Sequence, residues 1–416
     1  MRQVTAILIG AGNRGAEAYA SYALQHPNEF KVIGVAEPRK DRREEFARLH
    51  HIDEENCSSD WKELLGRPKF ADCAMICTPD HLHYEPVMMA LEQGYNVLCE
   101  KPMSGNKEEI LEMAQKARDC GRLLSVCHVL RYSPFFSKLK MLLDEDVVGD
   151  LICIQHIESI GYWHMAHSFV RGNWRSQEKS NPIILAKCCH DMDILSWLVG
   201  SRCVSVSSFG SLMHFVPDNK PIGAPDRCLD GCQHRDQCPY YAPRFYLEHP
   251  QAKKDGFDKI VSLDTTADGI ISALQTGPYG RCVYACDNDV ADHQVVNLQY
   301  ENGVTVSMTM CAFTEKCERV INIMGSKGQI CGNMDENEIH YCDFATGEKH
   351  HIELHVPSGN HNGSDVSMMQ NFVKLIAAES SQSLTDANTS IESHLIALAA
   401  EESRVHGGKP VAIAIK

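Results

Sequence analysis

The first 130 residues alternate between short apolar segments and segments of helical periodicity. Five apolar segments have the length of buried parallel strands, at residues 4–9, 31–36, 71–77, 96–99 and 123–127. Between them, apolar residues recur with the spacing of one helix face at 41–49, 85–93 and 107–120. Repeated strand–helix units predict an α/β domain over residues 1–130, an N-terminal Rossmann fold with a doubly wound parallel sheet.

The pattern changes after about residue 148, where apolar and polar residues begin to alternate. Such alternation at 152–158 and 294–300 is typical of strands with one buried face. Glu301-Asn302-Gly303 predicts a hairpin turn, and Ser326-Lys327-Gly328 predicts a second one. Helices are expected at 189–198, 364–378 and 391–405. We therefore expect a C-terminal α+β domain over residues 131–416 with a largely antiparallel sheet.

Charge narrows the range of partners. The chain has 40 Lys and Arg against 55 Asp and Glu, a formal net charge of −15. Nucleic acid and anionic membrane surfaces bind basic faces, so neither is expected as a partner. The first residues lead directly into a strand and a glycine turn, without an apolar segment of membrane-spanning length, and we expect a cytoplasmic protein. The open face of an antiparallel sheet favours a homodimer or homotetramer.

A glycine turn follows the first expected strand. Gly10, Gly12 and Gly15 form a GxGxxG sequence that opens a helix, and Glu37 ends the next strand. This context is typical of a dinucleotide site. The glycines let the backbone approach the pyrophosphate, the helix N-terminus faces the phosphates, and the carboxylate accepts hydrogen bonds from the ribose hydroxyls. A carboxylate also repels a 2′-phosphate, so we predict NAD over NADP, although Arg39 and Lys40 could accommodate a phosphate.

Residues 77–102, CTPDHLHYEPVMMALEQGYNVLCEKP, place TPD and EKP at the ends of two successive strands. Together with the glycine turn and a later His190 helix, this segment resembles the Gfo/Idh/MocA oxidoreductase family, whose fold is a Rossmann domain followed by an α+β domain. The resemblance implies an NAD-dependent oxidoreductase and a set of cofactor-binding residues: Gly10, Gly12, Asn13, Arg14, Gly15, Glu37, Thr78, Pro79, His83, Glu100, Lys101 and Arg131. In this set His83 begins a helix, Glu100 holds the nicotinamide side and Lys101 reaches the reacting carbon. The Lys101–Pro102 bond is expected to be cis.

The second half of the implied active site lies around His190. His190 and Asp193 are three residues apart on one helical face and resemble the HxxD of the family. The resemblance implies that Lys101 and His190 are catalytic and share a proton relay, and that Lys187 and Asp193 face the substrate. Many family members carry an acidic residue four positions before the histidine, where this chain has Ala186.

Residues 161–175 are dense in aromatic, His and Arg side chains. Aromatic faces stack on the C–H surfaces of sugars and Arg binds anionic or hydroxylated groups, so the segment is a candidate substrate loop. The residues assigned to substrate here are His164, His167, Arg171 and Trp174. A rigid structural loop is the alternative. A later turn with His361 before Ser364 fits either a functional loop or a helix cap.

An irregular insertion at about 216–264 is rich in Pro, Gly, Cys and Tyr. Cys228, Cys232 and Cys238 lie close together in it, and three thiols with one further ligand suit a structural zinc ion. His234, Cys282 and Cys286 are all open as the fourth ligand, and reduced, metal-free cysteines are the alternative.

Three functions remain open for the whole chain. The first is net hydride transfer between NAD and a carbinol of a sugar, polyol or glycoside. The second is a redox-neutral NAD-dependent glycosidase that acts by transient oxidation at C3 and elimination. The third is a non-enzymatic dinucleotide-binding regulator, which would not need Lys101 and His190.

Overall fold

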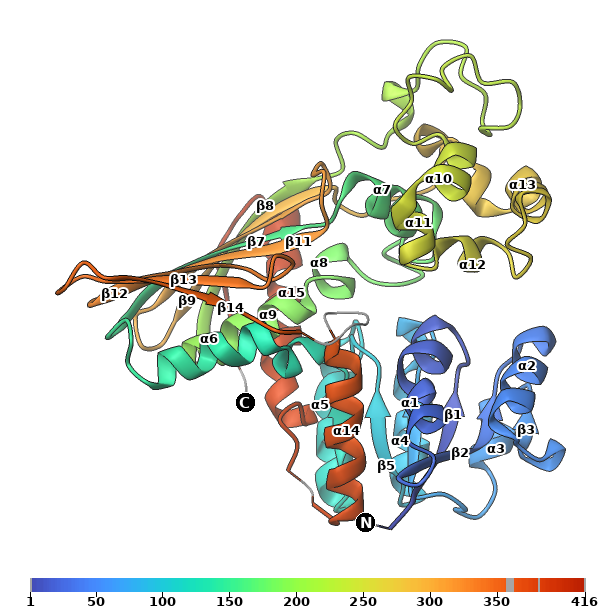
Figure 1. Cartoon of the computed structure of the whole chain (residues 1–416), viewed down its shortest axis with the longest axis horizontal. Helices are drawn as coiled ribbons and strands as arrows, with labels where there is room; N and C mark the ends of the chain where they lie inside the picture. The colour runs from blue at the N-terminus through green and yellow to red at the C-terminus, as the bar shows by residue number, and fades with distance from the viewer. Residues whose placement is uncertain (1, 357–362, 381, 415–416) are drawn as a thin grey trace.

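Two sheets organise the chain in the computed structural model, which describes residues 2–356, 363–380 and 382–414 (Figure 1). The N-terminal sheet has six strands in the order β3-β2-β1-β4-β5-β6, and every neighbouring pair is parallel. Its strands are β1 (Val4–Ile9), β2 (Phe30–Ala36), β3 (Cys57–Ser58), β4 (Cys73–Ile76), β5 (Asn96–Cys99) and β6 (Leu124–Val126). The predicted Rossmann sheet is confirmed.

Helices cover both faces of this sheet. They are η1 (Asn13–Ala20), α1 (Ser21–Gln25), α2 (Lys40–His50), α3 (Trp61–Leu65), α4 (Tyr84–Glu92) and α5 (Lys107–Asp119). Short turns η2 (Glu54–Asn56), η3 (Asp80–Leu82) and η4 (Val129–Tyr132) connect them. The strands are apolar on both faces, as parallel strands between two helical layers must be.

The second sheet has nine strands in the order β14-β13-β12-β11-β7-β10-β9-β8-β15. They are β7 (Leu151–Ser159), β8 (Cys203–Ser211), β9 (His293–Tyr300), β10 (Thr305–Cys311), β11 (Glu318–Gly325), β12 (Gly328–Asn333), β13 (Glu338–Asp343), β14 (Lys349–Glu353) and β15 (Val411–Ala412). Only β7 and β10 pair in parallel, so the prediction of a largely antiparallel sheet is confirmed. Both predicted hairpin turns are present, between β9 and β10 and between β11 and β12.

One face of the second sheet carries helices. These include α6 (Pro134–Asp144), which contacts β13, and α9 (Cys189–Val199), which follows the short α8 (Ile183–Ala186). On the outward face, Phe209 lies opposite Val295, and Thr309 lies between Val295 and Ile157 in the ladder. Phe209, Val295 and Ile157 are all exposed. Association through this face into a homodimer or homotetramer stays a prediction.

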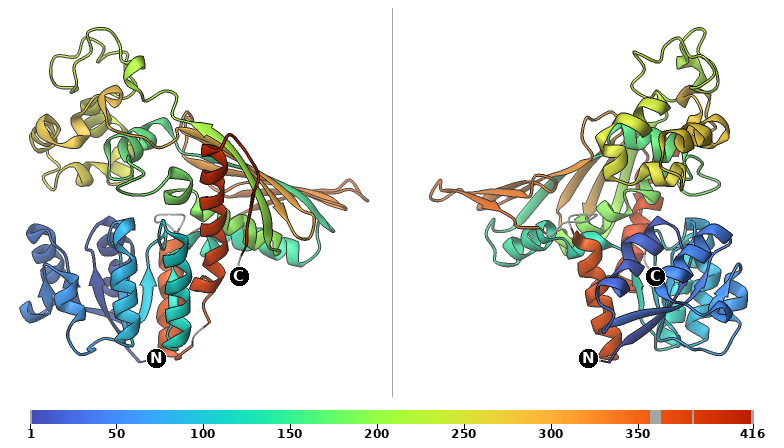
Figure 2. Two further views of the ribbon diagram at one scale, coloured as in Figure 1. Left: turned by 180° about the vertical axis from the view of Figure 1, so that it is seen from behind. Right: turned by 45° about the vertical axis from the view of Figure 1, so that its right-hand side comes forward.

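Of the two C-terminal helices, the last one connects the halves of the molecule (Figure 2). Helix α14 (Ser364–Ala377) packs on η1 and β1 of the parallel-sheet half. Helix α15 (Ala387–Val405) contacts α5 and β6 on one side and α9 and β8 on the other. Because α15 touches both halves, it fixes how the carboxyl ends of the parallel strands face α8 and α9.

The segment between β8 and β9 forms a helical lobe beside the second sheet (Figure 1). Its helices are α10 (Ala242–Glu248), α11 (Pro250–Lys254), α12 (Phe257–Val261) and α13 (Ala267–Thr276), with turns η6 (Pro217–Asn219), η7 (Pro278–Gly280) and η8 (Val283–Ala285). Helix α7 (Tyr162–His164) and turn η5 (Met165–Arg171) lie against it, and Trp163 joins its apolar core beside Phe245 and Phe257. Within the described residues, no helix combines the length and the apolar composition needed to cross a membrane.

Candidate active site

The three glycines of the turn after β1 meet different structural requirements. Gly10 has a φ of +93°, and a Cβ there would lie 2.5 Å from the carbonyl oxygen of Cys77. A Cβ at Gly15 would lie 2.2 Å from the Gly10 oxygen. At Gly12, by contrast, a Cβ would meet no described atom within 4 Å apart from its chain neighbours. The turn is therefore tightly packed against the sheet at its first and third glycines and open at the second, as a dinucleotide pyrophosphate requires.

The carboxylate of Glu37 lies at this turn. Its Oε2 accepts from the backbone N–H of Ala11 at 2.9 Å, and its Oε1 accepts from that of Arg39 at 3.0 Å. The neighbouring cations point to other carboxylates: Arg39 donates to Asp41 at 2.7 Å, and Lys40 lies 3.7 Å from Glu44. The carboxylate predicted to bind the ribose is thus held at the glycine turn, while both basic residues form exposed ion pairs.

Arg14 connects the glycine turn to the end of β5. Its Nε donates to Glu100 at 2.9 Å, and its terminal nitrogens donate to Asp365 of α14 at 2.7 and 3.1 Å. Tyr19 donates to the same Glu100 oxygen at 2.5 Å. Burial alone would raise the pKa of Glu100, but the charges of Arg14 and Lys101 hold it below its ordinary value. A carboxylate at this position therefore stays ionised at neutral pH.

Asn13, the other polar residue predicted at the turn, lies at the start of η1. Its side-chain amide donates to Glu17 at 3.2 Å, one helical turn further along. This contact holds the Asn13 side chain along the helix.

The TPD segment after β4 is fastened from two sides. His83 is fully buried, with Nδ1 2.7 Å from the Pro102 carbonyl oxygen and Nε2 2.9 Å from that of Thr78. Thr78 donates its hydroxyl to the Leu82 carbonyl at 3.1 Å, which closes the turn that begins at Pro79. His83 directly precedes α4, where the resemblance placed it, and it ties the TPD turn to the EKP turn.

Asp80 is a site residue that the sequence did not single out. It is buried, and it accepts hydrogen bonds from Trp174, Ser180 and Asn181 at 3.2 to 3.4 Å. All three donors lie between η5 and α8, in the part of the chain that follows the parallel sheet. A buried carboxylate at the end of β4 is therefore a joint between the two halves, next to the expected cofactor position.

Lys101 reaches across the same interface. The Lys101–Pro102 bond is cis, and the Lys101 ammonium donates to the carbonyl oxygen of Ala186 at 2.8 Å. The backbone N–H of Lys101 donates to Glu100 at 2.8 Å. Ala186 ends α8, four residues before His190, so its backbone meets the lysine at the position where many relatives carry an acidic side chain.

His190 lies in the first turn of α9 and is buried. The ring of His128, which follows β6, stands edge-on to it with the ring centres 5.8 Å apart. Burial holds the pKa of His128 well below its ordinary value, and the charges of Arg131 and Lys101 lower it further. A neutral imidazole therefore supports the ring of His190 from the Rossmann side.

A third histidine, His394 of α15, lies behind His128 with its ring centre 5.5 Å away. Its Nε2 accepts from the backbone N–H of Met103 at 2.8 Å, directly after the cis turn, and its Nδ1 lies 2.7 Å from the Ser390 carbonyl oxygen. Helix α15 therefore holds the EKP turn in place.

Arg131 and Asp193 bind each other. Arg131 donates to the two carboxylate oxygens of Asp193 at 2.8 Å each, and both side chains are buried. Arg131 also donates to the Leu384 carbonyl at 3.0 Å. The sequence assigned Arg131 to the cofactor and Asp193 to the substrate, but in the structure each occupies the other's hydrogen-bonding groups. The pair joins η4 to α9, and the assignment of Arg131 to the cofactor and of Asp193 to the substrate stays a prediction.

Lys187 is the partly exposed member of a charged cluster beneath α9 whose other members are buried: His156, Glu158, Asp191 and Arg319. Lys187 lies 3.2 Å from Glu158, and Arg319 bridges Glu158 and Asp191 at 2.9 and 2.8 Å. Burial is the largest single influence on the pKa of Lys187 and lowers it, but the nearby charges, led by the Glu158 carboxylate, together raise it above its ordinary value, so the lysine is charged. The sequence of β7 could have indicated this cluster, because the inward-facing positions of the strand, which are usually apolar, hold His156 and Glu158.

The candidate substrate loop separates into two groups. His167 is sandwiched between Phe257 and Tyr279, with ring centres 4.0 and 4.7 Å away. Arg171 is 1% exposed and donates to the carbonyls of Arg281 and Tyr240. Both side chains therefore pack within the helical lobe, as expected if this segment is a rigid structural loop and not a substrate loop. His164 and Trp174 are only partly buried; Trp174 reaches Asp80, and His164 lies 3.7 Å from the Cys317 sulfur.

The zinc site expected at Cys228, Cys232 and Cys238 is not formed. Among the described residues, the one group in which three potential ligand atoms lie within 4.8 Å of one another is elsewhere, at residues 338, 340 and 351. Cys228 is buried against Arg171, whose guanidinium lies 3.8 Å from its sulfur. A cation already occupies the space beside this thiol, so the close spacing in sequence does not become a ligand set. His361 lies outside the described residues.

The chain matches two family models in succession. Residues 4–128 match the model described as an oxidoreductase family with an NAD-binding Rossmann fold, and residues 140–413 match its C-terminal alpha/beta domain. The scyllo-inositol 2-dehydrogenase (NAD(+)) of Bacillus subtilis is 25% identical over 291 residues, covering 68% of this chain and 70% of that protein. The 2,7-anhydro-N-acetylneuraminate hydratase of Escherichia coli is 27% identical over 212 residues, covering 50% of this chain and 54% of that protein. In a solved structure, a levoglucosan dehydrogenase in complex with NADH and L-sorbose shares the fold with a TM-score of 0.74 at 18% identity over the full length of both chains.

Proposed function

The chain belongs to the Gfo/Idh/MocA family of oxidoreductases, and from this premise we propose that it transfers a hydride between NAD and a carbinol carbon of a sugar, polyol or glycoside. The observation that carries the proposal is the hydrogen bond from the Lys101 ammonium to Ala186 at 2.8 Å. It joins the two segments that hold the candidate catalytic groups, the EKP turn at the end of β5 and the start of α9 with His190.

The residues of the glycine turn fit a dinucleotide. The open space over Gly12 would admit the pyrophosphate at the N-terminus of η1, and Glu37 would accept hydrogen bonds from the adenosine ribose. Because a 2′-phosphate would meet this carboxylate while Arg39 and Lys40 are engaged with other carboxylates, we propose NAD as the preferred cofactor. The bound nicotinamide supplies the hydride acceptor.

The protein's own contribution is to hold the carbinol and take its proton. We propose that Lys101 Nζ and the imidazole of His190 share the hydroxyl proton, one receiving it and the other orienting the oxygen. Glu100 positions the lysine through the Lys101 backbone N–H. His128 fixes the plane of the His190 ring from behind. Glu100 and His128 are both buried, so bulk water does not reach Lys101 and His190 from the side away from the substrate.

His164, Trp174 and Lys187 are the proposed substrate contacts. All three are partly exposed and come from segments that flank α8 and α9. An aromatic ring and a charged ammonium suit a hydroxylated substrate, since the ring covers C–H faces and the ammonium donates to oxygens. The scyllo-inositol and glucoside dehydrogenases among the relatives act on compounds of this kind by name.

The test is to incubate the protein with NAD and a panel of free sugars, inositols and glycosides, and to analyse products by mass spectrometry. A product that lacks two hydrogens, formed together with an equal amount of NADH, is the expected result. NAD binding with no turnover of any compound in a broad panel would favour the regulator instead.

The relative named as a hydratase supports a second candidate, the redox-neutral glycosidase. Adding water makes no net redox change, so a fold of this family is compatible with such an outcome. In the same experiment, sugar released from a glycoside only when NAD is present, with no net NADH, would assign this function.

A further inference from the structure

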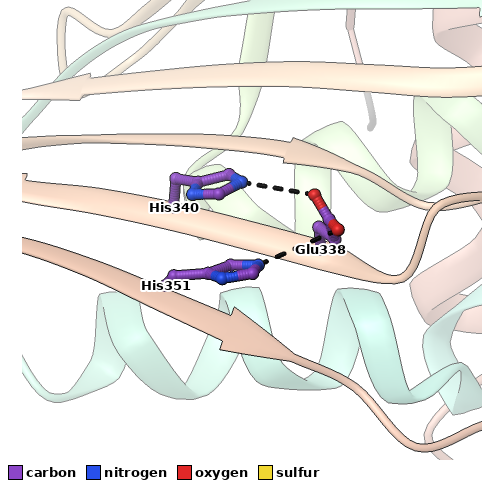
Figure 3. A group of neighbouring side chains, drawn as sticks. All are labelled: Glu338, His340 and His351. Carbon is purple, nitrogen blue, oxygen red and sulfur yellow. Dashed lines mark hydrogen bonds and ion pairs between the residues drawn. The ribbon is translucent and has the colours of Figure 1, made fainter.

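Three ligating side chains meet on the outward face of the second sheet, far in sequence from the candidate active site. Glu338 and His340 lie two residues apart on β13, and His351 lies on β14. His340 Nε2 is 3.4 Å from Glu338 Oε2, and His351 Nε2 is 3.9 Å from Glu338 Oε1. Figure 3 shows the two imidazoles side by side with their ring nitrogens directed at the carboxylate.

The β-ladder itself fixes this arrangement. His340 is the register partner of His351, and the two rings stack with their centres 4.4 Å apart and an angle of 8° between them. Glu338 projects to the same face as His340 because side chains two positions apart on a strand share a face. His340 and His351 also line a hollow of about 190 Å³ at this edge of the sheet, to which Tyr341 and His350 of the opposite face contribute as well. The backbone therefore holds the three ligands together before any ion binds.

We propose that Glu338, His340 and His351 bind a divalent transition-metal ion of the zinc type. Two neutral imidazoles and a carboxylate are ligands that zinc accepts, with a fourth position left to water. Zinc bonds of about 2.0 to 2.1 Å in a tetrahedron place ligand atoms about 3.3 Å apart. The two imidazole nitrogens lie 3.4 and 3.9 Å from different oxygens of the Glu338 carboxylate, and one ligand atom from each residue falls within 4.8 Å of the others, so the side chains must draw together to reach this spacing. Across the described parts of the chain, this is the one group of three such atoms within 4.8 Å of one another.

Charges of both signs lie around the three ligands: Lys349 precedes His351 by two residues on the same face of β14, and two carboxylates lie at the other end of the strand pair. Glu353 is the register partner of Glu338, so two carboxylates face each other directly across the last two strands. Like charges in directly opposed positions destabilise an antiparallel pair unless a cation lies between them. Since β14 is an edge strand, a bound ion would fasten it to β13 at the place where the ladder is weakest.

The experiment is a zinc titration of the full-length protein, stripped of metal beforehand, against a competing chelating dye. The test variants are His340→Gln, His351→Gln and Glu338→Gln. The matched control is His350→Gln, because His350 lies on the same strand but stacks on Tyr341 at 4.2 Å, on the other side of the ladder. Any zinc bound by the 19 cysteines is common to all five proteins, so differences between them isolate this site.

The expected result is one zinc equivalent that the wild-type and His350→Gln proteins bind about tenfold or more tightly than each of the three test variants do. The same stoichiometry and affinity in all five proteins would overturn the proposal, as would an equal loss in the control. Cobalt serves as a second probe that does not depend on the stability of any variant. Absorption from cobalt bound by nitrogen and oxygen supports the site, whereas a thiolate charge-transfer band alone would place the metal at cysteines and overturn it.

Discussion

The ammonium of Lys101 donates a hydrogen bond to the carbonyl oxygen of Ala186, and this 2.8 Å contact links the turn after β5 of the parallel sheet to the end of α8. It gives the lysine a fixed direction before any ligand binds. A lysine held in this way meets the geometric requirement for proton transfer at one defined position.

Replacing Lys101 with Ala, or His190 with Ala, is therefore expected to lower kcat by about 10²-fold or more, the usual contribution of a positioned acid–base group. Binding of NADH, followed by fluorescence, should weaken far less than kcat falls, because neither side chain contacts the glycine turn and only Lys101 is assigned to the nicotinamide end of the cofactor. The control is Lys107→Ala, which removes an exposed lysine at the start of α5. Near-normal turnover in both test variants would remove these residues from the mechanism.

Replacing Glu37 with Ala should shift the cofactor preference. The variant loses the carboxylate that repels a 2′-phosphate, so the ratio of NADH to NADPH affinity should fall by about tenfold or more, which corresponds to about 1.4 kcal/mol. Titrations with both cofactors measure this ratio. Glu44→Ala, which removes an exposed carboxylate in α2, is the control, and a wild-type preference for NADPH would contradict the assignment of NAD.

The buried pair of Arg131 and Asp193 predicts a large loss of stability when one partner is removed. Asp193→Asn leaves the Arg131 charge buried without its counter-charge, and the free energy of unfolding should fall by about 3 to 5 kcal/mol. The double variant Arg131→Met/Asp193→Leu should lose less than the sum of the single changes, because no buried charge remains.

Urea unfolding measures these free energies. Arg39→Met is the matched control, since Arg39 and Asp41 form an exposed pair that should contribute at most about 1 kcal/mol. Additive losses in the Arg131 and Asp193 variants would show that the two residues act independently.

Two buried histidines make stability depend on pH. Burial lowers the pKa of His394 to about 3, with His128 adding to the shift, and burial lowers that of His167 to about 3, with the charge of Arg171 adding to it. Because the unfolded imidazole has its ordinary value of 6.5, the unfolded state takes up protons first as the pH falls. The stability contributed by each neutral histidine is therefore complete above pH 6.5 and is lost progressively between about pH 6.5 and pH 3, at about 1.4 kcal/mol per pH unit.

Urea unfolding at pH 7, 6 and 5 tests this dependence. His167→Phe keeps an aromatic ring between Phe257 and Tyr279, and its stability should fall less steeply with decreasing pH than that of the wild type. A variant with the wild-type slope would mean that His167 is not buried as a neutral ring.

Much of the fold and part of the candidate site were open to prediction from sequence because their causes are local. The strands of the parallel sheet are short apolar runs, and the turn at Gly303 is set by three consecutive residues. The glycine turn and the EKP segment carry their own backbone requirements, which show as Gly10 at a φ of +93° and as the cis bond before Pro102. A few neighbouring residues are enough to identify such strands and turns.

Other parts depend on contacts between distant segments, and these the sequence could not supply. Asp80 is bound by residues about 100 positions away, Arg14 by Asp365, and the backbone of Met103 by His394. Arg131 and Asp193 were assigned to two different ligands, because nothing in either segment states that the other is its partner. The three cysteines near residue 230 were close in sequence but not in ligand geometry.

The sequence alone thus determined the two-domain architecture, the family and the position of the glycine turn, since periodicity and short motifs encode backbone conformation directly. Only the tertiary structure decided which buried charges neutralise one another, which loop residues are packing residues, and that Glu338, His340 and His351 converge on one face of the sheet. The physical reason is that a buried charge is stable only beside its counter-charge, and a metal ligand set exists only where side chains meet. The packing of whole helices and strands determines which charges and which ligands meet, and separation along the chain does not.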